Sequence, residues 1–212
     1  MKKFILVLAA LTFSIAAYSQ GFEIGVKGGM NITAADVMKE ASKDVQITNK
    51  NTYNGGIYGR LKIKLVGIFI QPELVYNTRG YNFDIKEPIT GTTINIKQQS
   101  NYLDVPVLVG LKMFKFLRVY AGPNFQYLLT NEITGVDDAV ALAIDFKKTD
   151  MKKSNTGVQI GFGLDLSKFR VDVKYDFNPT DMGSPFSYQN QVQSIKTSMI
   201  TIQLGYKLFG IL

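Results

Sequence analysis

The chain has 212 residues, a formal net charge of +7, and neither histidine nor cysteine. The missing residue types exclude a disulfide framework, thiol nucleophiles, Ser-His-Asp catalysis and the commonest zinc ligands. The positive charge is mild and forms no basic blocks, so nucleic acid is not an expected partner.

The N-terminus has the pattern of a secretory signal peptide. Residues 1–3 read Met-Lys-Lys, residues 4–17 carry no charge, and residues 17–19 read Ala-Tyr-Ser. A basic start, a short apolar run and a small-x-small exit are typical of a cleaved export signal, and the run is too short for a transmembrane helix. We therefore expect a signal peptide over 1–19 and one exported domain over 20–212.

Eight segments of the exported part alternate apolar and polar residues. This period of two is that of a β-strand, whose successive side chains point to opposite faces. Most of the segments are near ten residues long, and transmembrane strands need about 9–11 residues. The predicted strands, in chain order, are 22–30, 53–63, 68–76, 102–112, 118–129, 157–166, 169–177 and 200–208.

The connections between these strands alternate in length. Short turns are expected near 64–67, 113–116 and 167–168, and long polar loops over about 32–52, 79–100, 130–154 and 179–196, with short helices possible at 34–43 and 137–144. Short turns at one end and long loops at the other are the plan of an outer-membrane barrel. The sequence predicts an all-β, eight-stranded antiparallel up-and-down transmembrane barrel with short periplasmic turns and four long external loops.

The faces of the strands distinguish two barrel architectures. A soluble lipocalin-like barrel would place apolar residues inside, whereas a membrane barrel places charges inside. Aromatic residues near the strand ends, glycines on the polar faces and near-balanced charge favour the membrane barrel, because buried charges require partners. We call the predicted inward set the lumen charge network: Glu23, Lys27, Arg60, Lys62, Glu73, Asp104, Arg118, Asp165, Arg170, Asp172, Lys174, Asp176 and Lys207.

Five motifs follow one another along the exported part: GVKGGMN (25–31), QPELVYNTRG (71–80), NYLDVPVLVGLK (101–112), AGPNFQYLL (121–129) and QLGYKLF (203–209). Together they resemble the PorT-like outer membrane β-barrel domain family of Gram-negative bacteria. The resemblance implies a small barrel in the cell outer membrane, without implying an activity. One departure is that Phe209 is followed by three residues, whereas family barrels usually end on an aromatic residue.

No catalytic, cofactor or metal site is expected from the residues. Asp172 and Asp176 lie four apart on one strand face, roughly 13 Å by the strand rise, which is too far for a glycosidase pair. The acidic pair 137–138 lacks the ligands that calcium needs. Gly161 and Gly163 lie inside a strand, so they do not form a dinucleotide fingerprint.

The favoured function is therefore that of a non-enzymatic barrel with a filled, salt-bridged lumen. We expect it to act through its external loops in envelope structure, adhesion or docking of envelope proteins, as a monomer in outer-membrane lipid. The first alternative is a soluble exported lipocalin-like barrel that binds a small apolar ligand. The second is a lipid-modifying enzyme that would depend on Glu73, Asp104 or Asp172.

Overall fold

A computed structural model of the chain gives the architecture of its described residues. All of its described elements are strands, and among these residues no helix is long and apolar enough to cross a membrane. The predicted signal peptide, the possible helix at 137–144 and most of that at 34–43 lie outside the described part. The described residues are 21–36, 45–49, 51–63, 67–86, 93–134, 147–148, 152–178, 186–188, 191–192 and 196–211.

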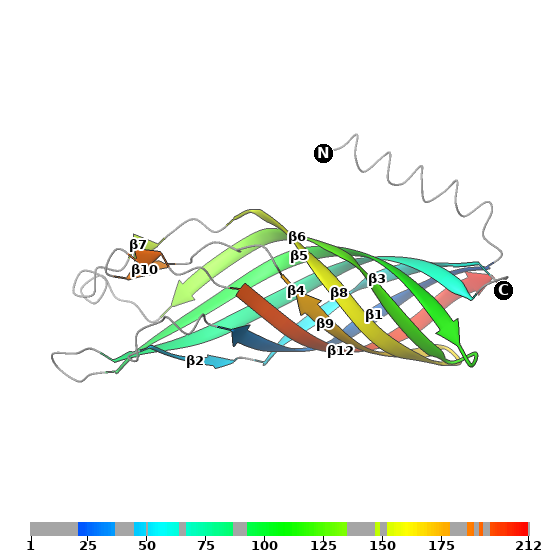
Figure 1. The fold of residues 1–212 in the computed structure, drawn as a ribbon, viewed down its shortest axis with the longest axis horizontal. Coiled ribbons are helices and arrows are strands. Elements are labelled where there is room, and N and C mark those ends of the chain that lie inside the picture. Colours follow the sequence, from blue (N-terminus) through cyan, green and yellow to red (C-terminus); the bar gives the residue numbers. More distant parts are fainter. Residues whose placement is uncertain are drawn as a thin grey trace.

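Eight long strands form a closed antiparallel barrel (Figure 1). Each strand pairs with its neighbours in the chain, and β1 also pairs with β12, which closes the cylinder. The predicted fold class is therefore confirmed. The barrel strands are β1 (Gly21–Asp36), β3 (Asn51–Ile63), β4 (Ile68–Lys86), β5 (Thr93–Met113), β6 (Leu117–Thr134), β8 (Ser154–Leu166), β9 (Phe169–Phe177) and β12 (Lys196–Ile211).

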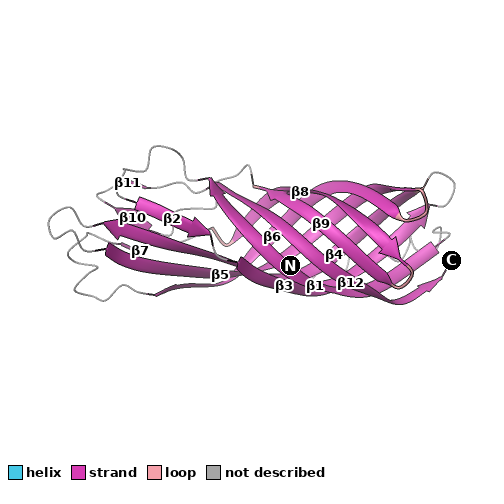
Figure 2. Ribbon diagram, turned by 90° about the horizontal axis from the view of Figure 1, so that it is seen from below, coloured by secondary structure: helices cyan, strands magenta, loops and turns pink. Residues whose placement is uncertain are grey.

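Four short strands lie beyond one end of the barrel, which we call the extension end (Figure 2). There β2 (Val45–Asn49) pairs with the last part of β4. A separate sheet joins β7 (Lys147–Lys148), β10 (Phe186–Tyr188) and β11 (Gln191–Val192). Two long connections that are far apart in the sequence therefore meet at this end.

Tight turns join the strands at the opposite end, which we call the turn end. The β8–β9 loop has two residues and places Ser167 at a φ of 59°. The β5–β6 loop places Phe114 and Lys115 at φ values of 49° and 65°. Gly67 precedes β4 with a φ of 68°, a conformation that costs glycine little because it has no Cβ. The predicted turns at 113–116 and 167–168 are located here, and of the predicted turn at 64–67 only Gly67 lies in the described part of the chain.

Several strands are longer than predicted, and the expected long loop at 79–100 is wrong. In the structure, β4 and β5 stay paired as far as Lys86 and Thr93. The register places Phe83 opposite Ile96, and aromatic and β-branched residues favour strands. The predicted loop over 32–52 is likewise shortened, because β1 extends to Asp36. The described start of the possible helix at 34–43 is therefore part of this strand.

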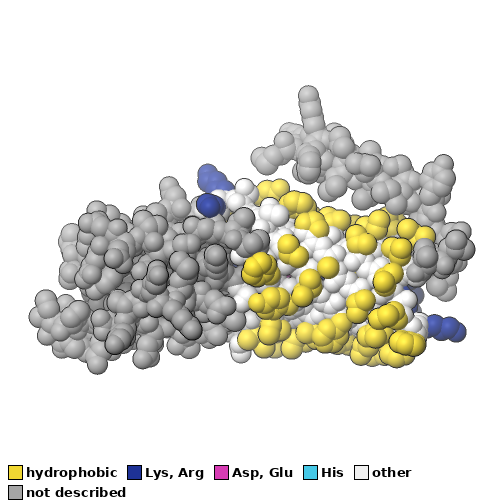
Figure 3. Space-filling model, in the orientation of Figure 1, with side chains coloured by type: hydrophobic (Ala, Val, Ile, Leu, Met, Phe, Trp, Pro, Cys, Tyr) yellow, Lys and Arg dark blue, Asp and Glu magenta, His cyan; other side chains and the backbone are white. Residues whose placement is uncertain are grey.

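The barrel wall is apolar outside and polar inside. Hydrophobic side chains cover the face of the wall seen in Figure 3, where Lys and Arg appear only near its two ends. A soluble lipocalin-like barrel requires a polar exterior and an apolar interior. The alternative of a soluble barrel is therefore wrong. Outward-facing hydrophobic residues include Ile57, Leu74, Val109, Phe125, Ile160, Phe162, Ile202 and Leu204, all more than one third exposed.

The membrane-spanning interpretation of this apolar surface can be tested at Phe162, which lies near the middle of β8 opposite Val173. We expect Phe162→Arg to lower the free energy of unfolding by about 2–4 kcal/mol, because the charge would enter the hydrocarbon. Equilibrium urea unfolding in phospholipid vesicles measures this loss. The control is Phe116→Arg in the β5–β6 turn, where the cost is about 0–1 kcal/mol. Equal losses at both positions would contradict a lipid-facing wall.

Candidate functional site

The barrel interior is filled by long polar side chains that alternate with the outward apolar ones. The largest fully buried side chains of the described residues are those of Arg60, Arg79 and Arg118. An eight-stranded barrel is just wide enough to be filled in this way. The lumen is thus the place where most ionisable groups of the described strands meet.

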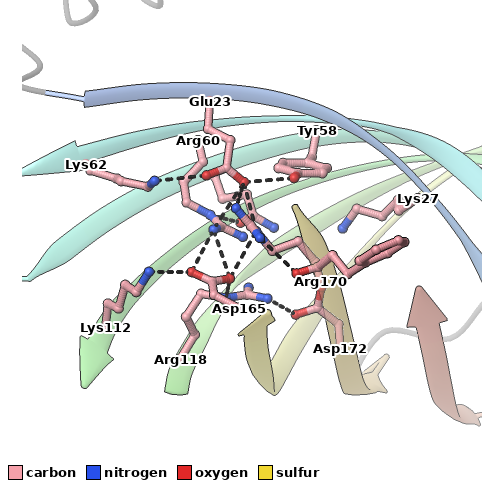
Figure 4. Close-up of polar contacts among 12 residues, drawn as sticks. Glu23, Lys27, Tyr58, Arg60, Lys62, Lys112, Arg118, Asp165, Arg170 and Asp172 are labelled. Carbon is pink, nitrogen blue, oxygen red and sulfur yellow. Dashed lines mark hydrogen bonds and ion pairs between the residues drawn. The ribbon is translucent and has the colours of Figure 1, made fainter. Parts of the chain in front are cut away.

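Glu23 on β1 is the first of two carboxylates that hold the turn end together (Figure 4). Its oxygens lie 2.9 Å from Lys62 Nζ, 2.9 Å from Arg170 Nη2 and 3.5 Å from Arg60 Nη1. The Tyr58 hydroxyl donates a further hydrogen bond of 2.8 Å. Glu23 thereby links strands β3 and β9 across the lumen.

Asp165 on β8 is the second of these carboxylates, and it faces Glu23 in Figure 4. It contacts Arg118 at 2.6 Å and Lys112 at 2.7 Å. It also contacts Arg170 at 3.1 Å and Arg60 at 3.3 Å. Arg60 and Arg170 therefore bridge both carboxylates, and one continuous network spans the turn end.

Asp172 on β9 extends the network toward the middle of the lumen. Arg118 Nη2 lies 3.0 Å from Asp172 Oδ1, and the Tyr120 hydroxyl donates to the same oxygen at 2.7 Å. A Cβ built on Gly163 would overlap both this carboxylate and the Arg118 guanidinium. The glycine on the polar face of β8 thus provides the room for the Asp172–Arg118 pair.

The middle of the lumen is occupied by Glu73 between two lysines. Lys174 Nζ lies 2.7 Å from one carboxylate oxygen, and Lys27 pairs with the other. The Gln71 amide donates to Glu73 at 2.6 Å and accepts from Arg60 Nε at 2.6 Å. Gln71 therefore connects the middle of the lumen to the turn end.

Toward the extension end, amides replace most of the charges. Arg79 lies 2.9 Å from Asp104 and donates to Gln126 at 3.0 Å. Asp176 accepts from the Gln159 amide at 2.9 Å and from Asn124 at 3.1 Å. Further buried amides continue this layer, among them Asn31, Asn54, Asn77 and Gln203.

Ion pairs join the predicted residues of the lumen charge network with three exceptions: Asp104 pairs with Arg79, Asp176 accepts hydrogen bonds from amides, and Lys207 lies apart. That lysine is half-buried beside a β-bulge between β1 and β12, and no ion pair joins it to another described residue. Sequence reasoning missed Arg79 and Lys112. Arg79 continues the inward alternation of Gln71 and Glu73 through β4, so the strand period could have found it once the loop boundary was moved.

The lumen offers little to acid–base or metal chemistry. Among the described residues, no group of three or more acidic side chains could hold a metal ion. The candidate carboxylates of the enzyme alternative, Glu73, Asp104 and Asp172, each lie in an ion pair with lysine or arginine. A carboxylate held by such partners stabilises charge and is poorly placed to exchange protons with a substrate.

A closed eight-stranded barrel with an apolar exterior and a charged interior defines the class of small outer-membrane β-barrel proteins. The family model described as outer membrane protein beta-barrel domain matches residues 16–182. The chain belongs to this family, which locates it in the outer membrane. No curated protein matches the sequence.

Solved structures show the same fold at low sequence identity. The crystal structure of the outer membrane protein OprG from Pseudomonas aeruginosa matches with a TM-score of 0.51 and 13% identity, over 90% of this chain and 97% of that chain. The structure of the outer membrane protein AlkL in lipid bilayers matches with a TM-score of 0.48 and 14% identity, over 88% of this chain and 90% of that chain. The crystal structure of Ail from Yersinia pestis matches with a TM-score of 0.45 and 12% identity, over 89% of this chain and 99% of that chain. The match to OprG alone supports the fold.

The four contacts of Asp165 predict that its charge is essential to the turn end. We expect Asp165→Asn to lower the free energy of unfolding by about 3–5 kcal/mol, because buried cations lose a shared counter-ion. Urea unfolding in detergent micelles measures the loss.

The matched control is Lys112→Gln, which breaks one Asp165 contact from a partly exposed side chain. Its expected cost is below about 1 kcal/mol. A loss for Asp165→Asn as small as that of the control would show that the network contributes little to stability.

Proposed function

We propose that this protein is a non-enzymatic, non-conducting barrel that acts at its extension end in docking, adhesion or envelope structure. By the usual plan of such barrels, the short turns face the periplasm and the extension end faces outward. A monomer in outer-membrane lipid, an envelope protein as partner and the narrower PorT-like assignment remain predictions from the sequence.

The observation that carries the proposal is the occupied lumen. Arg60, Arg79 and Arg118 are fully buried within it, and they lie at two different levels of the barrel. Arginines that pair with carboxylates on other strands would have to leave those partners before an aqueous path could open. This argues against a general porin and moves the function to the ends of the barrel.

The extension end supports a docking role by the length of its strands. β4 has 19 residues and β5 has 21, whereas a membrane crossing needs about 9–11. The surplus forms a paired hairpin with β2 added at its side. Such a hairpin presents a rigid surface away from the bilayer, to which a partner can bind with little loss of conformational entropy.

Planar-bilayer recording tests the filled lumen. We expect no large, stable open-channel currents from the purified protein, because ion-paired arginines occupy the lumen. A triple variant with Arg60, Arg79 and Arg118 replaced by serine is the positive control, since it removes the three largest fully buried side chains of the described residues from both levels of the barrel. Stable currents from the unaltered protein would overturn the proposal.

Photocrosslinking in the native envelope tests the docking role. Probes at the exposed residues Lys97 and Glu132 report on the extension end, and a probe at Lys168 in the β8–β9 turn is the matched control. We expect discrete protein adducts only from the first two positions. The adduct from Glu132 should disappear in a variant that joins Gly80 to Gln99 by a two-residue turn, because the protruding hairpin, which also carries Lys97, is then removed. Identical adducts from all three probes would contradict the proposal.

A further inference from the structure

We propose that the turn end of the barrel holds a binding site for an anionic phosphate group. The site is a cavity of about 310 Å³ between the β3–β4 and β5–β6 turns. Five basic residues line it, together with Phe69, and none of the described lining residues is acidic. The basic residues are Arg60, Lys62, Lys112, Lys115 and Arg118.

The first argument is the balance of charge at this end. Glu23 and Asp165 are shared by five cations, namely Arg60, Lys62, Lys112, Arg118 and Arg170. Arg118 has Asp172 as a further partner, but this carboxylate also accepts from Tyr120. Cations withdrawn from water need counter-ions, so an excess of this size favours an added anion.

The second argument is the state of Arg118 in the cavity wall. Its side chain is fully buried, and its Nη1 atom has no hydrogen-bond partner among the described residues. A buried N–H group without an acceptor costs about 1–3 kcal/mol, and more when the group is charged. An anion in the cavity would supply an acceptor to this guanidinium.

The third argument is the mixture of rigid and adaptable donors. Arg60 and Arg118 present planar guanidinium groups from the strands, and both are buried. Lys62 and Lys112 are partly exposed, with 23% and 29% of their side chains accessible, so they can reach toward an entering group. Phosphate offers several acceptor oxygens in different directions, which suits such a set better than a single planar carboxylate does.

The position of the cavity allows two sources of phosphate. Its lining includes Ile63 and Ile68 at the ends of β3 and β4, where the apolar wall meets the turn end. In the orientation that we propose above, headgroups of anionic phospholipids in the inner leaflet reach this level, and free phosphate compounds can approach from the periplasm. Both sources offer the same chemistry to the site.

Two binding experiments on the purified full chain distinguish these sources. In the first, inorganic phosphate is titrated by calorimetry against the protein in an uncharged detergent. In the second, native mass spectrometry follows retention of phosphatidylglycerol relative to phosphatidylcholine from mixed nanodiscs. Saturable phosphate binding alone identifies a free anion as the ligand, selective retention alone identifies a lipid headgroup, and either supports the site.

The test variant is Lys62→Gln/Lys112→Gln, and the matched control is Lys97→Gln/Lys153→Gln, which removes two exposed lysines near the extension end. Loss of two charge-assisted contacts should weaken phosphate binding, or reduce lipid selectivity, at least about tenfold. The control variant should bind as the unaltered protein does. Heat-modifiable gel migration verifies that both variants form closed barrels.

Two results would overturn the proposal. One is the absence of both phosphate binding and lipid selectivity in the unaltered protein. The other is an equal loss in the test and control variants, which would indicate attraction by net charge without a defined site.

Discussion

The shared ion pairs of Glu23 and Asp165 are the interaction on which the rest of the structure depends. They join side chains from β1, β3, β5, β6, β8 and β9 across the lumen. Because the ionised groups of the described strands point inward and pair there, the outer wall can be largely apolar and face lipid. Because long side chains occupy the interior, we expect no open aqueous path. The same contacts therefore explain why the outer wall is compatible with lipid. They also explain why we expect the protein to act at the ends of the barrel.

Charge is not distributed evenly along the axis of the barrel. Near the turn end, five cations share two carboxylates, whereas toward the extension end Arg79 pairs with Asp104 and Asp176 accepts from amides. The carboxylates at that end are satisfied mainly by amides such as Gln159. The lumen is thus positive at the turn end and polar or negative toward the extension end, which is the arrangement that favours anions at the turn end alone.

The strand period separated the two faces of each strand, because alternation such as that of 169–177 fits no other regular structure. Which face lies inside followed from the aromatic strand ends, the glycines on the polar faces and the balanced charge. The strand period could not reveal Arg79, since a polar hairpin that leaves the membrane resembles a loop in composition. Nor could the strand period show that Lys207 lies outside the network, because it does not predict the bulge between Ile24 and Gly25 beside which this lysine lies. The ion-pair partner of each lumen side chain could not be predicted either, because many partners lie on strands that are not adjacent. Which side chains meet then depends on how far each strand is shifted along its neighbours around the barrel.

One of these contacts also constrains how the barrel is assembled. Arg170 donates to Glu23 over a separation of 147 positions, and β12 lies between their two strands in the sheet. The bond can therefore form only after the seam between β1 and β12 has paired, which is the last step of closure. Until then, Glu23 and Arg170 need water or other polar groups, and contacts of such long range are slow to form. Before that step Glu23 has Arg60 and Lys62 of the neighbouring β3 as partners and Arg170 has Asp165 of the neighbouring β8, so closure of the seam joins two half-networks into one.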